Sequence, residues 1–151
     1  MTAPEWMNYA HIRSRNNTEN RMRHMAVVYH ARRINGVVQC WCKWDDARMY
    51  HLTNVGVHSP DGFEMGYGGS GPADLALTIL CDFMGLRRAG PETFTGENLG
   101  YAVQTAWEFH QDVKRKWIQE HRNHVEITGR QLKEMIGEDI LTACNWRSAL
   151  R

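Results

Sequence analysis

The sequence lacks a long hydrophobic run. No stretch of its 151 residues reaches the roughly 18 consecutive apolar residues that a membrane-spanning helix requires. The N-terminus also lacks the charged start, the apolar run and the small-residue cleavage site of a secretory signal. We therefore expect a cytoplasmic protein without a membrane partner.

Cysteine is scarce, and the four thiols do not follow the spacing of a disulfide framework. This pattern fits a reducing compartment. Cys40 and Cys42 flank one residue, but no second pair with zinc-site spacing accompanies them, so buried thiols are the simpler interpretation. His121 and His124 lie in a charged run and are interpreted as surface residues. The sequence predicts no metal site and no cofactor.

Net charge is nearly absent, at +1 from 18 basic and 17 acidic residues, which excludes a global attraction to nucleic acid or membrane. The charge is nevertheless uneven. Residues 1–33 carry six arginines against two glutamates, whereas residues 45–100 carry eight acidic and three basic residues. One interpretation is two solvated surfaces of opposite sign. The other is a basic arm that contacts phosphate or an acidic protein.

The sequence does contain a globular composition, with 42% hydrophobic and 23% charged residues. Six tryptophans and five tyrosines supply large apolar side chains for a core. We expect a polar, basic N-terminal arm over residues 1–24, a single α+β domain over residues 25–137 and a C-terminal tail over residues 138–151.

The β part of this domain is expected to be a small antiparallel meander. Val27 to Tyr29 indicate a strand, and Asn35-Gly36 is typical of a tight hairpin turn. Alternation in the return strand separates two faces, with Val38, Cys40, Cys42 and Trp44 on one and Val37, Gln39, Trp41 and Lys43 on the other. Further extended pieces are expected at residues 48–54 and 63–67.

A buried helix and a long amphipathic helix are expected to pack against the meander. Residues 72–84 are apolar nearly all round, which predicts a central helix with Pro72 at its first position and Asp74 in its first turn. Residues 98–121 predict the amphipathic helix, with His110 on its apolar stripe as a hydrogen-bonded core histidine.

Two shorter helices are expected to close the chain. Thr128 and Gln131 have the spacing of a capping box and predict a short helix that ends at Gly137. The tail is expected to be helical around residues 139–146.

Residues 58–76 carry a distinctive run, His-Ser-Pro-Asp-Gly-Phe-Glu-Met-Gly-Tyr-Gly-Gly-Ser-Gly-Pro-Ala-Asp-Leu-Ala. It resembles the signature of a small domain family of unknown function found in bacteriophage, plasmid and bacterial proteins. Residues 109–115 and 125–136 resemble the same family's second helix and its closing strand and helix. Met65 stands where an aromatic residue is expected in that family. The resemblance implies a protein of a mobile element and is silent on activity.

The glycine-rich turn within this run allows two interpretations. Its glycines permit a sharp turn into the buried helix. Successive amides at a helix N-terminus would instead hold an anion or a nucleotide, which makes Gly68, Gly69, Ser70 and Gly71 candidate anion-binding residues. The turn lacks the Lys-Ser/Thr of a nucleotide P-loop.

No catalytic residue is predicted. Ser70 as a nucleophile, with His58 and Asp61 as its triad partners, would need glycine at position 72, where the chain has Pro72. Two groups of basic residues are candidate contacts with nucleic acid or a partner. They are Arg13, Arg15, Arg21 and Arg23 in the arm, and Lys114, Arg115, Lys116 and Arg122 along and after the second helix. A basic run of the second kind is also typical of a solvated helix face.

Three functions are therefore compared. The first is a non-enzymatic accessory protein of a mobile element that binds a host protein complex in the host cytoplasm, for example to inhibit a CRISPR or restriction system. The second is a nucleic-acid-binding module that uses the basic arm and helix face. The third is a nucleotide- or anion-binding protein built on the glycine-rich turn.

Overall fold

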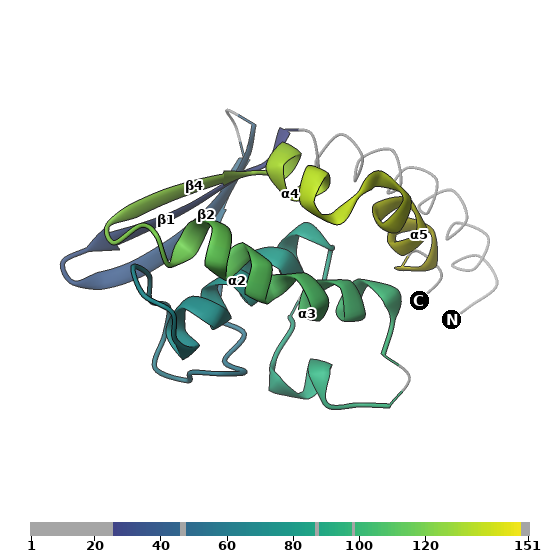
Figure 1. Cartoon of the computed structure of the whole chain (residues 1–151), viewed down its shortest axis with the longest axis horizontal. Helices are drawn as coiled ribbons and strands as arrows, with labels where there is room; N and C mark the ends of the chain where they lie inside the picture. Colours follow the sequence, from purple (N-terminus) through teal and green to yellow (C-terminus); the bar gives the residue numbers. More distant parts are fainter. Residues whose placement is uncertain (1–25, 46–47, 87, 98, 149–151) are drawn as a thin grey trace.

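The computed structural model describes residues 26–45, 48–86, 88–97 and 99–148, and for residues 45 and 145–148 the description is limited to the backbone. The expected basic arm, with Arg13, Arg15, Arg21 and Arg23, lies outside the described residues. The predicted α+β class is confirmed, because an antiparallel sheet is covered on one face by helices (Figure 1).

The sheet is built from four strands in the order β3-β2-β1-β4. Their bounds are Val28–Ile34 for β1, Val37–Asp45 for β2, Arg48–His51 for β3 and His124–Thr128 for β4. The predicted turn joins β1 to β2, with φ angles of 51° at Asn35 and 80° at Gly36. Positive φ at both positions is what a two-residue hairpin turn requires. Strand β4 comes from much later in the chain and pairs with β1.

The helices lie together on one side of the sheet (Figure 1). Their bounds are Ser70–Phe83 for α2, Pro91–Phe94 for the 3₁₀-helix η1, Tyr101–Val113 for α3, Lys114–Ile118 for the π-helix η2, Gly129–Ile136 for α4 and Glu138–Ser148 for α5. Helix α2 is buried at every residue from Gly71 to Cys81, as its composition predicted. None of the described helices is long and apolar enough to cross a bilayer.

The core lies between the sheet and α2. Tyr29 of β1 and Cys40 and Cys42 of β2 are at most 1% exposed, and Val38 is 4% exposed, so the predicted alternation is confirmed there. Trp44, near the end of β2, is partly buried. The hydroxyl of Tyr29 donates to Asp82 Oδ2 at 2.6 Å, which ties β1 to α2. The four cysteines, all within the described residues, are buried and form no disulfide, and burial raises the pKa of Cys81 to about 12. These cysteines act as small core residues, as expected.

Residues 63–67 do not form the expected strand. Gly66 takes a φ of 90°, and its N–H donates to Ile118 O at the end of η2 at 3.1 Å. The guanidinium of Arg33 holds Glu64, with Nη2 2.8 Å from Oε1, and this hydrogen bond holds the pKa of that carboxyl below its usual range. The segment is therefore held by the Arg33 side chain and by the end of η2. Its short apolar alternation was too weak a signal to predict a strand.

Helix α2 begins two residues earlier than predicted. It starts at Ser70 with Gly69 as its N-cap, and no side chain caps this end, so Pro72 is the third helical residue. Asp74 consequently lies beyond the first turn. We expected this carboxylate to lie in the first turn and to complement the helix dipole there. Instead, Asp74 is fully buried.

The predicted long helix is real, but its second half is wound differently. After α3 the chain widens into the π-helix η2, in which the N–H of Gln119 donates to Lys114 O, five residues back, at 3.0 Å. The wider turn allows the consecutive residues Trp117 and Ile118 both to be buried. The predicted capping box is confirmed, because Gln131 N donates to Thr128 Oγ1 at 3.0 Å.

Candidate functional site

Four aromatic rings form a row across the face of the sheet that points away from the helices, which we call the open face. Trp41 of β2 lies between His30 of β1 and His51 of β3, with ring centroids 5.2 and 6.1 Å away. His124 of β4 lies beyond His30, at a centroid distance of 6.0 Å and an interplanar angle of 13°. We call His51, Trp41, His30 and His124 the ring row, and it spans all four strands.

The strand register produces the ring row. Trp41 is paired with His30 on one side and with His51 on the other. The chain neighbours of these residues, such as Tyr29 and Cys42, point into the core, so the rings point outward. Directly opposed side chains in antiparallel strands lie close enough to stack. The rings are thus positioned by the backbone of the sheet and not by a loop.

Two cations flank the ring row on the open face. Lys43 lies two residues beyond Trp41 in β2, and Arg32 lies two residues beyond His30 in β1. Both side chains are exposed. Gln39, which is paired with Arg32, adds a side-chain amide on the same face. The open face therefore combines flat rings, positive charge and a hydrogen-bonding amide.

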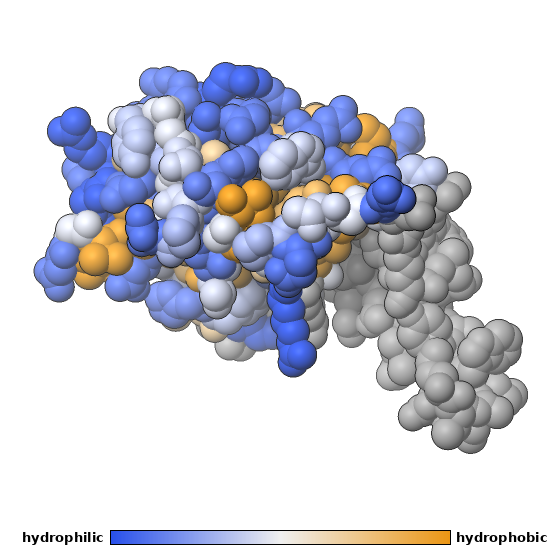
Figure 2. Space-filling model, turned by 90° about the horizontal axis from the view of Figure 1, so that it is seen from below, coloured by the Kyte–Doolittle hydropathy of each residue, from blue (hydrophilic) through white to orange (hydrophobic). Residues whose placement is uncertain are grey.

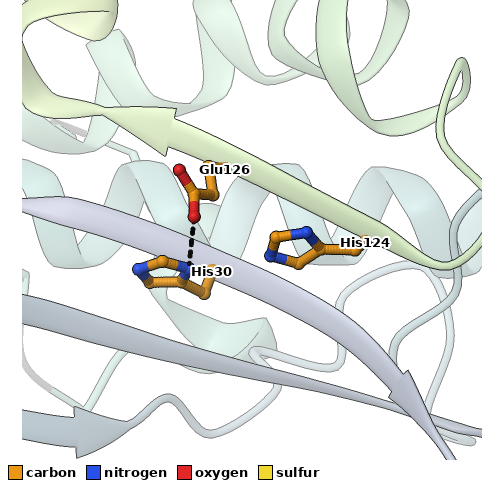
Figure 3. A group of neighbouring side chains, drawn as sticks. All are labelled: His30, His124 and Glu126. Atoms are coloured by element: carbon orange, nitrogen blue, oxygen red, sulfur yellow. Dashed lines mark ion pairs between the residues drawn. The ribbon is translucent and has the colours of Figure 1, made fainter.

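A histidine–carboxylate cluster occupies the β1–β4 end of the ring row. His30, His124 and Glu126 each offer one donor atom, and these atoms all lie within 4.8 Å of one another. Figure 3 shows the three side chains together over the two neighbouring strands, with His30 Nδ1 3.4 Å from Glu126 Oε1. Partial burial lowers the pKa of His30, an effect that Glu126 opposes and that His124 and Lys43 reinforce.

A second polar cluster lies in the helical layer, where Asp74 of α2 holds the loop before it. The buried carboxylate of Asp74 accepts hydrogen bonds from the backbone N–H groups of His58, at 2.8 Å, and Ser59, at 2.6 Å. The imidazole of His58 turns to α3, where its Nε2 lies 3.2 Å from His110 Nε2. The candidate triad paired His58 with Asp61, but the carboxylate that contacts this loop is that of Asp74. It accepts hydrogen bonds from backbone N–H groups and not from the His58 imidazole.

His110 is a core histidine, as predicted, because only 3% of it is exposed. Its Nδ1 hydrogen-bonds to the backbone carbonyl of Trp107, and its Nε2 also lies 3.1 Å from Gln111 Nε2. Burial lowers the pKa of His110, against the opposing effect of that backbone hydrogen bond. The hydrogen bonds of His58 and Ser59 fasten this loop to α2 and α3, whereas the other two contacts of His110 lie within α3.

The glycine-rich turn is packed too closely for side chains at two positions. A Cβ on Gly71 would lie 2.6 Å from the Cβ of Glu64, and a Cβ on Gly66 would lie 2.9 Å from the Cα of Arg122. Among the described residues of the turn, Gly68, Gly69 and Gly71 do not take a positive φ. Close packing therefore explains part of this glycine pattern. Anion binding at Gly68, Gly69, Ser70 and Gly71 stays a prediction.

The basic residues of the second helix lie apart from the ring row. Lys114, Arg115 and Lys116 belong to η2, in the layer on the other side of the sheet. Arg115 Nη2 pairs with Asp112 Oδ1 at 2.6 Å, and both side chains are largely exposed. Arg122 is exposed in the connection to β4. Their contact with nucleic acid or a partner stays a prediction for a separate surface.

Sequence reasoning missed the ring row. The alternation in β2 did place Trp41 on the face opposite to the buried thiols. However, a row needs the register of three further strands, and β4 lies about 90 residues away along the chain. His30 and His51, on the extended segments predicted on either side of Trp41, were the signal that was available.

The comparisons with known proteins give one match. A family model described as a family of unknown function (DUF6166) matches residues 29–138. No curated protein and no solved structure matches the chain. The matched range contains the whole ring row and the cluster at Asp74.

Proposed function

The chain belongs to the DUF6166 family, and we propose that it is a non-enzymatic binding module whose open face binds single-stranded nucleic acid. The ring row is the observation that carries this proposal. Base–aromatic stacking contributes about 1–3 kcal/mol per base and tolerates any base sequence, because every base has a π-face.

The flanking charges suit the same ligand. A strand laid along the ring row would bring its phosphates near Arg32 and Lys43, both of which are exposed. Neutralising phosphates releases counterions, so binding of this kind weakens as salt rises. A duplex keeps its bases stacked on one another, whereas an unpaired strand can present them to protein rings. This difference favours a single strand.

A binding role also fits the state of the buried carboxylate. Asp74 accepts two backbone N–H groups and lies away from solvent, so it is engaged in holding the loop at His58. A general base must instead reach the proton that it abstracts. We therefore propose binding without catalysis.

Replacement of Trp41 tests the proposal. A labelled, unstructured oligonucleotide of about 12 nucleotides, a length typical of such sites, is titrated into the full chain at low salt. Loss of one stacking partner is expected to weaken binding by about 5- to 150-fold in Trp41→Ala. Trp107→Ala is the matched control, because Trp107 is 43% exposed and lies on α3 in the helical layer. It is expected to bind like the wild type.

Salt dependence adds a second readout. Arg32→Gln and Lys43→Gln are each expected to lower the slope of log affinity against log salt by about 1. Circular dichroism checks that each variant is folded. Absence of binding at low salt, or a Trp41→Ala variant that binds as tightly as the wild type, rules the proposal out.

A protein partner is the second candidate, and exposed apolar side chains favour it. Ile34 and Val37, which face each other across the β1–β2 turn, are 40% and 61% exposed. The face shown in Figure 2 is largely hydrophilic, with hydrophobic side chains in small separate spots. The partner is then the host protein complex expected from the sequence, in a mobile-element protein that inhibits a host defence system.

Capture from a host lysate tests this second candidate. The wild type is expected to retain a defined complex that Val37→Lys fails to retain, and to raise phage survival in cells that carry the defence system. Val28→Lys, a change on the same face away from the hairpin tip, serves as the control. Equal retention by the wild type and Val37→Lys would exclude the tip as the contact.

A further inference from the structure

We propose that His30, His124 and Glu126 form a site for a divalent transition-metal ion of the zinc type. Two imidazole nitrogens and one carboxylate oxygen converge there within 4.8 Å of one another. This inference does not depend on nucleic-acid binding.

The frame of the site is rigid. His30 and Glu126 are directly paired across β1 and β4, and His124 lies two residues before Glu126 on the same face. Trp41 lies against the His30 ring with an interplanar angle of 8°, which restrains the orientation of that ring. A metal ligand held by strand backbone and a stacked ring needs little ordering when the ion binds.

The donor set decides the kind of ion. Neutral imidazole with carboxylate suits Zn²⁺, Co²⁺ and Ni²⁺, whereas Mg²⁺ and Ca²⁺ prefer oxygen ligands alone. Ligand atoms about 2.0–2.2 Å from a tetrahedral zinc ion lie about 3.3–3.6 Å from one another. His30 Nδ1 and Glu126 Oε1, 3.4 Å apart, already have this separation. The donor atoms of the cluster lie within 4.8 Å of one another, and the exposed side chains of His124 and Glu126 can rotate to bring them to the tetrahedral separation.

The open face leaves room for a further ligand. Three protein ligands leave one position of a tetrahedral ion for water or another small ligand. Glu126 is 55% exposed at its side chain, so the ion would face solvent. The Glu126 carboxylate offsets half of the charge of the ion, whereas the positive charge of the nearby Lys43 repels the ion.

Metal titration of the tag-free full chain tests the site. Zn²⁺ is measured by calorimetry, and Co²⁺ is measured by visible absorption and by quenching of tryptophan fluorescence, because Trp41 lies against a ligand. We expect saturation at one equivalent with both ions. His124→Ala and Glu126→Gln are each expected to weaken binding by about tenfold or more, and to abolish the Co²⁺ quenching signal.

His51→Ala is the matched control, since His51 belongs to the ring row but not to the metal cluster. It is expected to bind one equivalent with wild-type affinity. The changed residues are exposed, so folding is expected to persist, and circular dichroism verifies it. Failure of the wild type to saturate would refute the proposal. So would binding by His124→Ala and Glu126→Gln that is as tight as that of the wild type.

Discussion

Individual residues in the helical layer show how a loop is fixed without a regular element. The backbone N–H of His58 donates to Asp74 of α2, and the His58 imidazole hydrogen-bonds to that of His110 on α3. One residue therefore connects the loop to both helices. The Trp107 ring lies against the His58 ring, with the ring centroids 5.5 Å apart. The Phe94 ring lies against Trp107 in turn, at a centroid distance of 5.6 Å. Because these polar atoms are paired inside the protein, the protonation of His110 changes the free energy of unfolding.

The stability of the protein is expected to fall as the pH drops through and below 6.5, the ordinary pKa of histidine. Burial lowers the pKa of His110 below its ordinary value of 6.5, so the unfolded chain binds this proton more readily than the folded chain. The stabilisation is complete above the unfolded pKa and is lost as the pH falls toward the folded pKa. The charges of the His58 ring and Lys114 reinforce this direction, whereas the backbone hydrogen bond to Trp107 and the charge of Asp74 oppose it.

Urea unfolding at several pH values measures this effect. His110→Gln is expected to be less stable near neutral pH but to lose less stability on acidification than the wild type. Gln104→Ala, an exposed change on the same helix, is expected to keep the wild-type pH profile. A profile that is equally steep in His110→Gln would show that other groups control it.

The core position of His110 could be predicted from the sequence because it lies on the apolar stripe of its own helix. Its contact with His58 could not, since that residue is 52 positions away in a loop. Local periodicity reports which side of an element is buried but not which loop side chain reaches it.

Single elements carry their own constraints, and α2 shows the clearest one. Gly71 is the second residue of α2, and a methyl group there would meet Glu64, with Cβ atoms 2.6 Å apart. Glu64 is itself held by Arg33 of β1. The start of α2, the loop before it and the sheet therefore pack as one unit.

Gly71→Ala is expected to lower the free energy of unfolding by about 1–3 kcal/mol, the usual cost of overpacking. In an exposed helix the same change is stabilising, so the sign of the effect reports the close contact. Gly96→Ala is the control, because a Cβ at Gly96 would meet only Leu99 Cδ2 at an ordinary 3.7 Å. Urea unfolding of both variants gives the comparison, and equal stabilities would mean that Glu64 moves aside.

Elements with local signals were predicted well. The Asn35-Gly36 turn and the Thr128–Gln131 capping box each depend on residues within three positions of one another. The π-helix was not predicted, because a helical period of 3.6 contains no mark of a locally wider turn. Residues 63–67 were assigned wrongly because they have strand-like side chains, while the turn at Gly66 prevents strand geometry.

The described part of the chain forms two layers, a sheet and a set of helices. The helical layer contains the buried polar cluster. The open face carries the ring row and the histidine–carboxylate cluster, and the latter is drawn in Figure 3. The order of the strands, in which β4 joins the edge beside β1, decides which side chains meet on the open face. That order is a property of the complete fold, so the sequence predicted the meander but not the surface it builds.

The basic arm of residues 1–24 and the open face are two distinct candidate sources of nucleic-acid affinity. A strand stacked on Trp41 would quench tryptophan fluorescence, and a variant in which Arg13, Arg15, Arg21 and Arg23 are all replaced by glutamine is expected to retain this quenching. Its salt dependence is expected to decrease if the arm contributes phosphate contacts. Titration at two salt concentrations measures both quantities. Loss of the quenching signal in this variant would place the binding site on the arm.

The π-helix η2 limits how the chain can vary in length. Deletion of one residue between 114 and 118 would restore the regular helical winding and rotate all that follows by about 100°. Ile118 O would then turn away from Gly66 N, which it binds at 3.1 Å, and Arg122 would lose its place against that glycine. Members of the family are therefore expected to differ in length around residues 88–97 and to keep the spacing from His110 to His124 constant.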